Sequence, residues 1–204
     1  MSALLALTLA ATSGAVEAER EFSAMAQADG QWTAFRHFAA EESVLFTPGP
    51  VDAQEALANL SDPAISVVWW PARSFVSCDG KLAINTGPWL RAHQGRQGSF
   101  VTVWRKQSDG GWRWLLDDGR DLETPIAAGE EPEIRQASCD GTPPAPDRAP
   151  VAQAAPRTFG GSPDGTLRWR VDIRPDGSRR LSAELYDGAR MEPVLTHEVP
   201  AEIP

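Results

Sequence analysis

The chain has few residues of the kinds that hold a structural zinc ion, with two cysteines and three histidines in 204 residues. The histidines, His37, His93 and His197, are far apart, and no His-x-His or Cys-x-x-Cys pair occurs. A structural zinc site needs closely spaced ligand pairs, so no metal site is predicted. The glycines of 160–165 lack the Lys-Ser/Thr ending of a phosphate loop and are interpreted as a turn. No cofactor is predicted.

A net positive charge is also absent. The chain has 19 basic and 28 acidic residues, for a formal charge of −9. Phosphate backbones and anionic lipid surfaces repel such a protein. Nucleic acid is therefore excluded as a predicted partner.

No apolar run reaches the roughly 20 residues that a membrane-spanning helix needs, so stable membrane insertion is not expected. A shorter run at 3–11, followed by small residues, predicts a signal peptide over 1–15 with cleavage after Ala15 or Ala18. No Lys or Arg precedes it, and a buried helix turn is the alternative. The prediction is a periplasmic or secreted protein, with a cytoplasmic one as the alternative.

The two cysteines, Cys78 and Cys139, permit one disulfide in an oxidising compartment and would be inert buried thiols in the cytosol. Cys78 precedes a predicted hairpin turn, and Cys139 lies in a proline-rich segment. A bridge would therefore tie that segment to the sheet.

Short apolar and aromatic runs separated by Asp-Gly pairs predict an antiparallel sheet in the first two thirds of the chain. Helical patterns at 16–29 and 32–39 precede it, so helices are expected to cover one curved sheet and enclose an interior. The other expected elements are a strand at 44–47, a helix at 52–60, and strands at 65–70, 73–78, 81–91, 98–107 and 112–118.

The composition changes after this unit. Seven prolines within 122–157 predict a linker or wrapping arm. Within 158–204, apolar and charged residues alternate over 167–173, and Asp176-Gly177 then turns the chain into a second strand, which predicts a hairpin. A lone hairpin is marginal in water, so it is expected to pack on the outer face of the first sheet or on a partner subunit.

These patterns resemble the nuclear transport factor 2-like superfamily, which includes ketosteroid isomerases and SnoaL-like polyketide cyclases. The resemblance is closest to uncharacterised exported bacterial members. It implies an α+β fold over 16–121, a cone-shaped curved antiparallel sheet with N-terminal helices, to which the C-terminal β-hairpin is an extension. The matching segments are 20–30, 32–46, 48–50, 98–104 and 111–117.

The catalytic residues of these enzymes are not carried over. Ketosteroid isomerases have an aspartate before a proline and a tyrosine on the first helix, where this chain has Thr47 and Phe22. Neither can act as a base or a proton donor near neutral pH. The His and Asp pair of SnoaL-like cyclases has no clear match.

Four tryptophans, Trp70, Trp89, Trp104 and Trp114, are candidate pocket walls, with plain core packing as the alternative. Asp117 stands beside Asp118, where neighbouring carboxyl groups raise a pKa and favour acid or base chemistry; the alternative is a solvated turn at 118–119. His37 is the other candidate proton carrier, provided that it points inward.

The leading hypothesis is an exported binding or accessory protein that forms a homodimer through its sheet and holds a small apolar molecule without catalysis. The alternative is a lyase or isomerase that acts on a hydrophobic cyclic substrate with His37 and Asp117 as proton-transfer groups. A structural dimerisation module is the third. A carboxyl or imidazole group at an open cavity favours the enzyme, and tryptophan walls alone favour binding.

Overall fold

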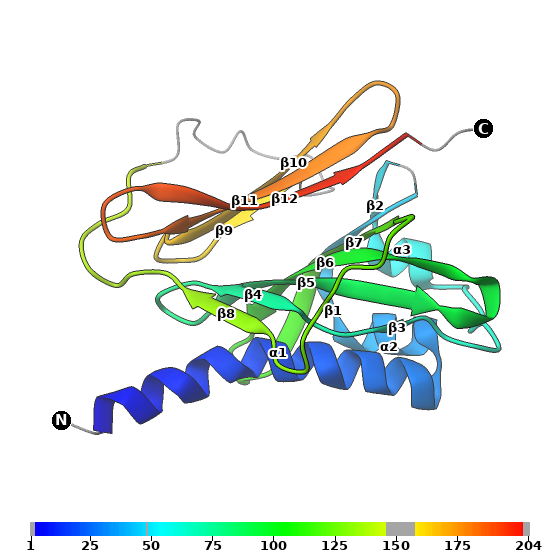
Figure 1. The fold of residues 1–204 in the computed structure, drawn as a ribbon, viewed down its shortest axis with the longest axis horizontal. Coiled ribbons are helices and arrows are strands. Elements are labelled where there is room, and N and C mark those ends of the chain that lie inside the picture. Colours follow the sequence, from blue (N-terminus) through cyan, green and yellow to red (C-terminus); the bar gives the residue numbers. More distant parts are fainter. Residues whose placement is uncertain (1–2, 48, 146–157, 202–204) are drawn as a thin grey trace.

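The computed structural model describes residues 3–47, 49–145 and 158–201. The chain folds into three layers, with helices against one face of a large curved sheet and a second, smaller sheet against the other face (Figure 1). The expected α+β cone architecture with a C-terminal β extension is therefore confirmed.

The helices are α1 (Ala3–Asp29), α2 (Gln31–Phe38) and α3 (Ala53–Leu57), with a 3-10 turn η1 (Ala92–Gln94). The strands of the large sheet are β1 (Ala39–Phe46), β2 (Pro50–Asp52), β3 (Val68–Trp69), β4 (Arg73–Val76), β5 (Leu82–Arg91), β6 (Arg96–Lys106), β7 (Trp112–Asp121) and β8 (Glu133–Gln136). Its order is β2-β1-β7-β6-β5-β4-β8, with β3 beside β5. The small sheet has the order β12-β11-β10-β9, formed by β9 (Phe159–Gly161), β10 (Leu167–Ile173), β11 (Arg179–Tyr186) and β12 (Met191–Val199).

The large sheet is mixed, whereas the sequence predicts a purely antiparallel one. The pairs β1–β7 and β4–β8 are parallel. In both pairs the two strands are far apart in the chain, and parallel strands require such long connections. The proline-rich arm supplies β8, so it wraps along the sheet and pairs with it.

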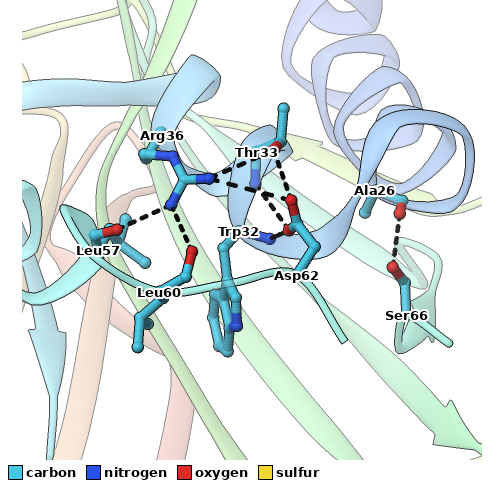
Figure 2. Close-up of polar contacts among 8 residues, drawn as sticks. All are labelled: Ala26, Trp32, Thr33, Arg36, Leu57, Leu60, Asp62 and Ser66. Atoms are coloured by element: carbon cyan, nitrogen blue, oxygen red, sulfur yellow. Dashed lines mark hydrogen bonds and ion pairs between the residues drawn. The ribbon is translucent and has the colours of Figure 1, made fainter. Parts of the chain in front are cut away.

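The orientation of α2 is fixed by a residue from a distant loop. Asp62 Oδ1 accepts hydrogen bonds from the backbone N–H groups of Trp32 (2.5 Å) and Thr33 (3.1 Å), and its Oδ2 accepts one from the Thr33 hydroxyl (2.6 Å), as Figure 2 shows. Gly30, the residue before the helix, has φ 118°, and a Cβ there would lie 2.4 Å from the Asp62 carboxyl group. Asp62 therefore caps the helix in place of a local side chain.

Two apolar cores flank the large sheet. The first lies between the sheet and the helices and is rich in aromatic rings: Phe22 lies 4.7 Å from both Phe35 and Trp69, centroid to centroid. The second lies between the two sheets and includes Phe75, Ile84, Val101, Val103, Leu116, Leu167, Trp169, Leu181 and Leu195. The rings of the first core fill much of the space under the helices.

The small sheet covers the outer face of the large one. The predicted hairpin is present as β10 and β11. The strand β12, which the sequence analysis did not predict, extends it; it contains Pro193 and pairs with β11 with a register shift between Ala183 and Glu184. A buried ion pair fastens the two sheets, since Arg179 Nη2 lies 2.5 Å from Asp118 Oδ1. A dimer through this outer face would have to displace the small sheet, and the homodimer stays a prediction.

Of the segment predicted as a signal peptide, 1–15, residues 1 and 2 lie outside the described residues, and 3–15 are helical and continuous with the rest of α1. Ala15 and Ala18, the residues after which the sequence predicts signal-peptide cleavage, are buried against the core. Over the residues that the structure describes, no helix has both the length and the apolar character to cross a bilayer. Export stays a prediction.

A disulfide joins Cys78, just after β4, to Cys139 in the arm, 61 residues later. Closing a loop of this length restricts the unfolded chain and stabilises the fold by about 4 kcal/mol. We expect reduction to lower the free energy of unfolding by that order, measured by urea denaturation with and without dithiothreitol. The double variant Cys78→Ala, Cys139→Ala should match the reduced protein and should not respond to the reductant; an equally stable reduced protein would contradict the assignment.

Candidate functional site

A cleft of about 680 Å³ lies at the end of the large sheet where β1 leaves β7. Five consecutive residues of β7, 117–121, line it. Successive side chains of a strand point to opposite faces, so a cleft lined by all five runs along the free edge of the strand. It therefore has a helix-side half and a half on the side of the small sheet.

The helix-side half has aromatic walls. Trp89 lies flat against β6 and β7, because a Cβ on Gly98 would stand 2.4 Å from its ring and only glycine leaves that space. The indole N–H of Trp89 donates to the Ser99 carbonyl oxygen at 3.2 Å, which fixes the ring. This half is also lined by Gln31, Trp32, Phe35, Val67, Trp69, Arg91 and Phe100. Such rigid walls suit an apolar ligand.

Asp117 is the titratable residue of β7 that lies next to the aromatic residues of the helix-side half. It is half-buried, and its Oδ2 accepts a hydrogen bond from the Thr102 hydroxyl at 2.9 Å. Burial raises the pKa of Asp117 to about 8, the charges of Glu19 and Asp118 add to the rise, and the Thr102 hydrogen bond opposes it. A carboxyl group with this pKa is partly protonated at neutral pH and can both accept and donate a proton.

Glu19 of α1 lies in the core close to Asp117, and its side chain has no solvent exposure. Its carboxyl oxygens accept hydrogen bonds from the indole N–H groups of Trp69 (2.8 Å) and Trp104 (2.6 Å) and from Asn85 Nδ2 (3.2 Å). Burial raises the pKa of Glu19 to about 7 against the opposing effect of these bonds. The three partners are all donors, so they favour the ionised form that burial disfavours.

Thr102 lies between the two carboxyl groups. Its hydroxyl donates to Asp117, and hydrogen bonding by Thr102 also lowers the pKa of Glu19. A hydroxyl has a single proton and can donate to only one of the two carboxyl groups at a time. Thr102 therefore links the buried carboxyl group to the one at the cleft.

The other half of the cleft is ionic. Arg179 donates to both carboxyl oxygens of Asp118, at 2.8 and 2.5 Å, and its guanidinium carbon lies 4.7 Å from the centroid of the Phe46 ring. Burial raises the pKa of Asp118, and the bonds from Arg179 oppose that rise. The solvated turn considered at 118–119 is absent, because β7 continues to Asp121 paired with β6.

The structure places most of the candidate residues that the sequence suggested in different parts of the fold. Asp117 and Trp89 line the cleft, as does Thr47. Trp104 and Trp114 are fully buried in the first core, and Trp70 lies partly exposed away from the cleft. His37 is exposed on α2, where its ring contacts Phe38, and it does not line the cleft.

Glu19 is the residue that the sequence analysis missed. The pattern carried a signal, because Ala15, Glu19, Phe22 and Ala26 follow one another at helical spacing on a single face of α1. A lone acid on an otherwise apolar face marks a buried carboxyl group. Among the described residues, no group of three or more His, Cys, Asp or Glu is placed to hold a metal ion.

No family model and no curated protein matches the chain. Two solved structures are similar. A nuclear transport factor 2-like superfamily protein from Salmonella enterica serovar Typhimurium is 16% identical, with 60% of this chain and 96% of that one covered at a TM-score of 0.42. A provisionally assigned aromatic ring hydroxylase from Novosphingobium aromaticivorans is 13% identical, with 59% and 94% covered at a TM-score of 0.40. Likenesses this remote add nothing to what the site itself shows.

The raised pKa values predict that stability falls as pH rises. Unfolded carboxyl groups titrate near pH 4, whereas Glu19 and Asp117 hold their protons to about pH 7 and 8 in the folded protein. The folded state therefore binds more protons within this window, and stability present at low pH is lost as pH rises through it. For Asp117 alone the loss between pH 6 and 9 is about 3 kcal/mol.

Asp117→Asn should flatten this decline and make the variant more stable than the wild type at pH 9, because an amide still accepts from Thr102 without a charge. Urea denaturation at a series of pH values measures the effect. Asp29→Asn, a matched change at an exposed position, should keep the wild-type slope. A slope unchanged in Asp117→Asn would show that Asp117 titrates normally.

Proposed function

We propose that the cleft binds a small molecule with an apolar body and that Asp117 exchanges a proton with it, as in an isomerase or lyase. The observation that carries this proposal is the position of Asp117: a carboxyl group with a pKa near neutrality at the wall of an open aromatic cleft. An imidazole is not needed, and the exposed His37 takes no part.

The network behind Asp117 supports the assignment. Thr102 holds the carboxyl group in place, and Glu19 keeps a second, buried carboxyl group close to it. A catalytic base works best when its pKa lies near the working pH. A lone aspartate has a pKa near 4 and is a weak base, so the burial of Asp117 beside Glu19 provides the basicity that proton abstraction next to a carbonyl group requires.

Binding without chemistry is the second candidate function. It is favoured by the aromatic lining, since Trp32, Phe35, Trp69, Trp89 and Phe100 account for much of the helix-side half. In that case the network around Glu19 would serve only to hold α1 on the sheet. The two candidates differ in whether a bound molecule exchanges a proton.

The test uses 4-acetylbiphenyl in deuterated buffer, with deuterium uptake at the acetyl methyl group followed by NMR. Proton abstraction needs the ionised carboxylate, so we expect the catalysed rate to rise with pH and to level off above about pH 8. Asp117→Asn should lower the rate by about 100-fold or more. Glu19→Gln removes the neighbouring charge and should move the midpoint down by about one pH unit.

Glu21→Gln, an exposed change on the same helix, is the control for Glu19→Gln and should keep the wild-type profile. Catalysis that survives in Asp117→Asn would assign the chemistry to another group. Binding of the ketone with no exchange above the buffer rate would support the binding protein instead.

A further inference from the structure

The cleft carries an excess of positive charge within an acidic protein. Four arginines line it, namely Arg91, Arg96, Arg120 and Arg179, against three aspartates, Asp117, Asp118 and Asp121. Arg96 is bound by Asp121 (2.7 Å) and Arg179 by Asp118 (2.5 Å), whereas the other two have no carboxylate within ion-pair distance among the described residues. The chain as a whole has a charge of −9 and repels anions, so this local excess points to an anionic ligand.

Arg120 is committed to the fold. Its Nε donates to the Ser99 hydroxyl at 3.2 Å, and its Nη1 donates to the Glu198 carbonyl oxygen at 2.9 Å. These bonds connect β7 to β12 and hold the two sheets together. Arg120 therefore serves to attach the small sheet, and Arg91 remains as the cation available to a ligand.

Arg91 lies in the helix-side half of the cleft, at the end of β5. It is half-buried, and its guanidinium carbon lies 6.0 Å from the centroid of the Trp89 ring. The aromatic ring steadies the cation without using its N–H groups. No hydrogen bond joins those groups to a residue within the described ranges.

Two further donors line the cleft together with Arg91, namely the Gln31 amide and the Trp32 indole N–H. Gln31 Oε1 accepts from the Val67 N–H at 3.1 Å, and the pairing of Val68 with Leu90, continued by one residue, sets Val67 opposite Arg91. In the part of the chain that the structure describes, neither the Gln31 amide nitrogen nor the Trp32 indole N–H has an acceptor. The free N–H groups of Arg91, Gln31 and Trp32 are thus all donors, and the group complementary to them is an oxyanion.

We propose that the cleft takes an elongated apolar carboxylate, with its carboxylate group bound by Arg91 and Gln31 and its other end against Asp117. A guanidinium group binds the planar carboxylate with two parallel hydrogen bonds. The pairing sets Asn85, Thr102 and Asp117 in one row across the sheet, and Arg91 is six residues beyond Asn85, or about 20 Å along the strand. A molecule that contacts both ends is therefore longer than a single ring. The role of its second end rests on the proposed function.

The test compares 4′-acetylbiphenyl-4-carboxylate with its neutral carboxamide by isothermal titration calorimetry at pH 7. We expect the wild type to bind the carboxylate about tenfold more tightly than the amide. Arg91→Gln should remove that preference and leave the affinity for the amide within about twofold, and Arg91→Lys should keep part of it. Arg113→Gln, at the far end of β7, is the control and should behave as the wild type.

Equal affinities of the wild type for the two compounds, no binding of the carboxylate, or a loss in Arg91→Gln that is the same for both would overturn the proposal. The proposed function fails separately. Carboxylate preference without deuterium exchange at the acetyl group leaves the inference standing and removes the chemistry at Asp117. Deuterium exchange of both compounds without a preference for the carboxylate removes the inference about Arg91 and leaves the chemistry at Asp117 standing. Asp117→Asn should lose exchange and keep the preference.

Discussion

The buried carboxyl group of Glu19 is the interaction on which the interior depends. One side chain of α1 accepts hydrogen bonds from Trp69 on β3, Asn85 on β5 and Trp104 on β6, so a helix and three strands converge on two oxygen atoms. The indole N–H groups of Trp69 and Trp104 can only donate, and an apolar residue at position 19 would leave both unpaired in the core. Such groups are costly to bury, so the position of the helix on the sheet is strongly specified.

The packing around Glu19 also determines where open space is left in the fold. Phe22, Phe35, Trp69 and Trp104 pack edge to face under the helices. Two of the four tryptophans that suggest a pocket in the sequence, Trp104 and Trp114, therefore belong to the core. The cleft lies instead at the end of the large sheet, where β1 separates from β7 and leaves one edge of β7 unpaired. Asp117 stands at the boundary, touching the buried network on one side and the cleft on the other.

The small sheet has two roles in this protein. It buries the outer face of the large sheet, and Trp169 and Leu181 belong to the same apolar core as Ile84 and Val103. The large sheet in turn covers the apolar face of the hairpin, which would be marginally stable by itself. It also completes the cleft, since Arg179 and the chain after β12 form part of its wall. The buried pair of Arg179 with Asp118 keeps this wall in place and neutralises two charges that would otherwise face a ligand.

The sequence by itself determined the local elements. Apolar periodicity and the Asp-Gly turns place the helices, the central strands and the hairpin, because these depend on neighbours within a few residues. It could not determine which tryptophans line the cleft, that β8 and β12 pair as strands, or that Glu19 and Asp117 share Thr102, since those residues are up to about a hundred positions apart in the chain. Only the tertiary structure decides such contacts, because long-range packing sets burial, and burial sets the pKa that turns an ordinary aspartate into a proton carrier.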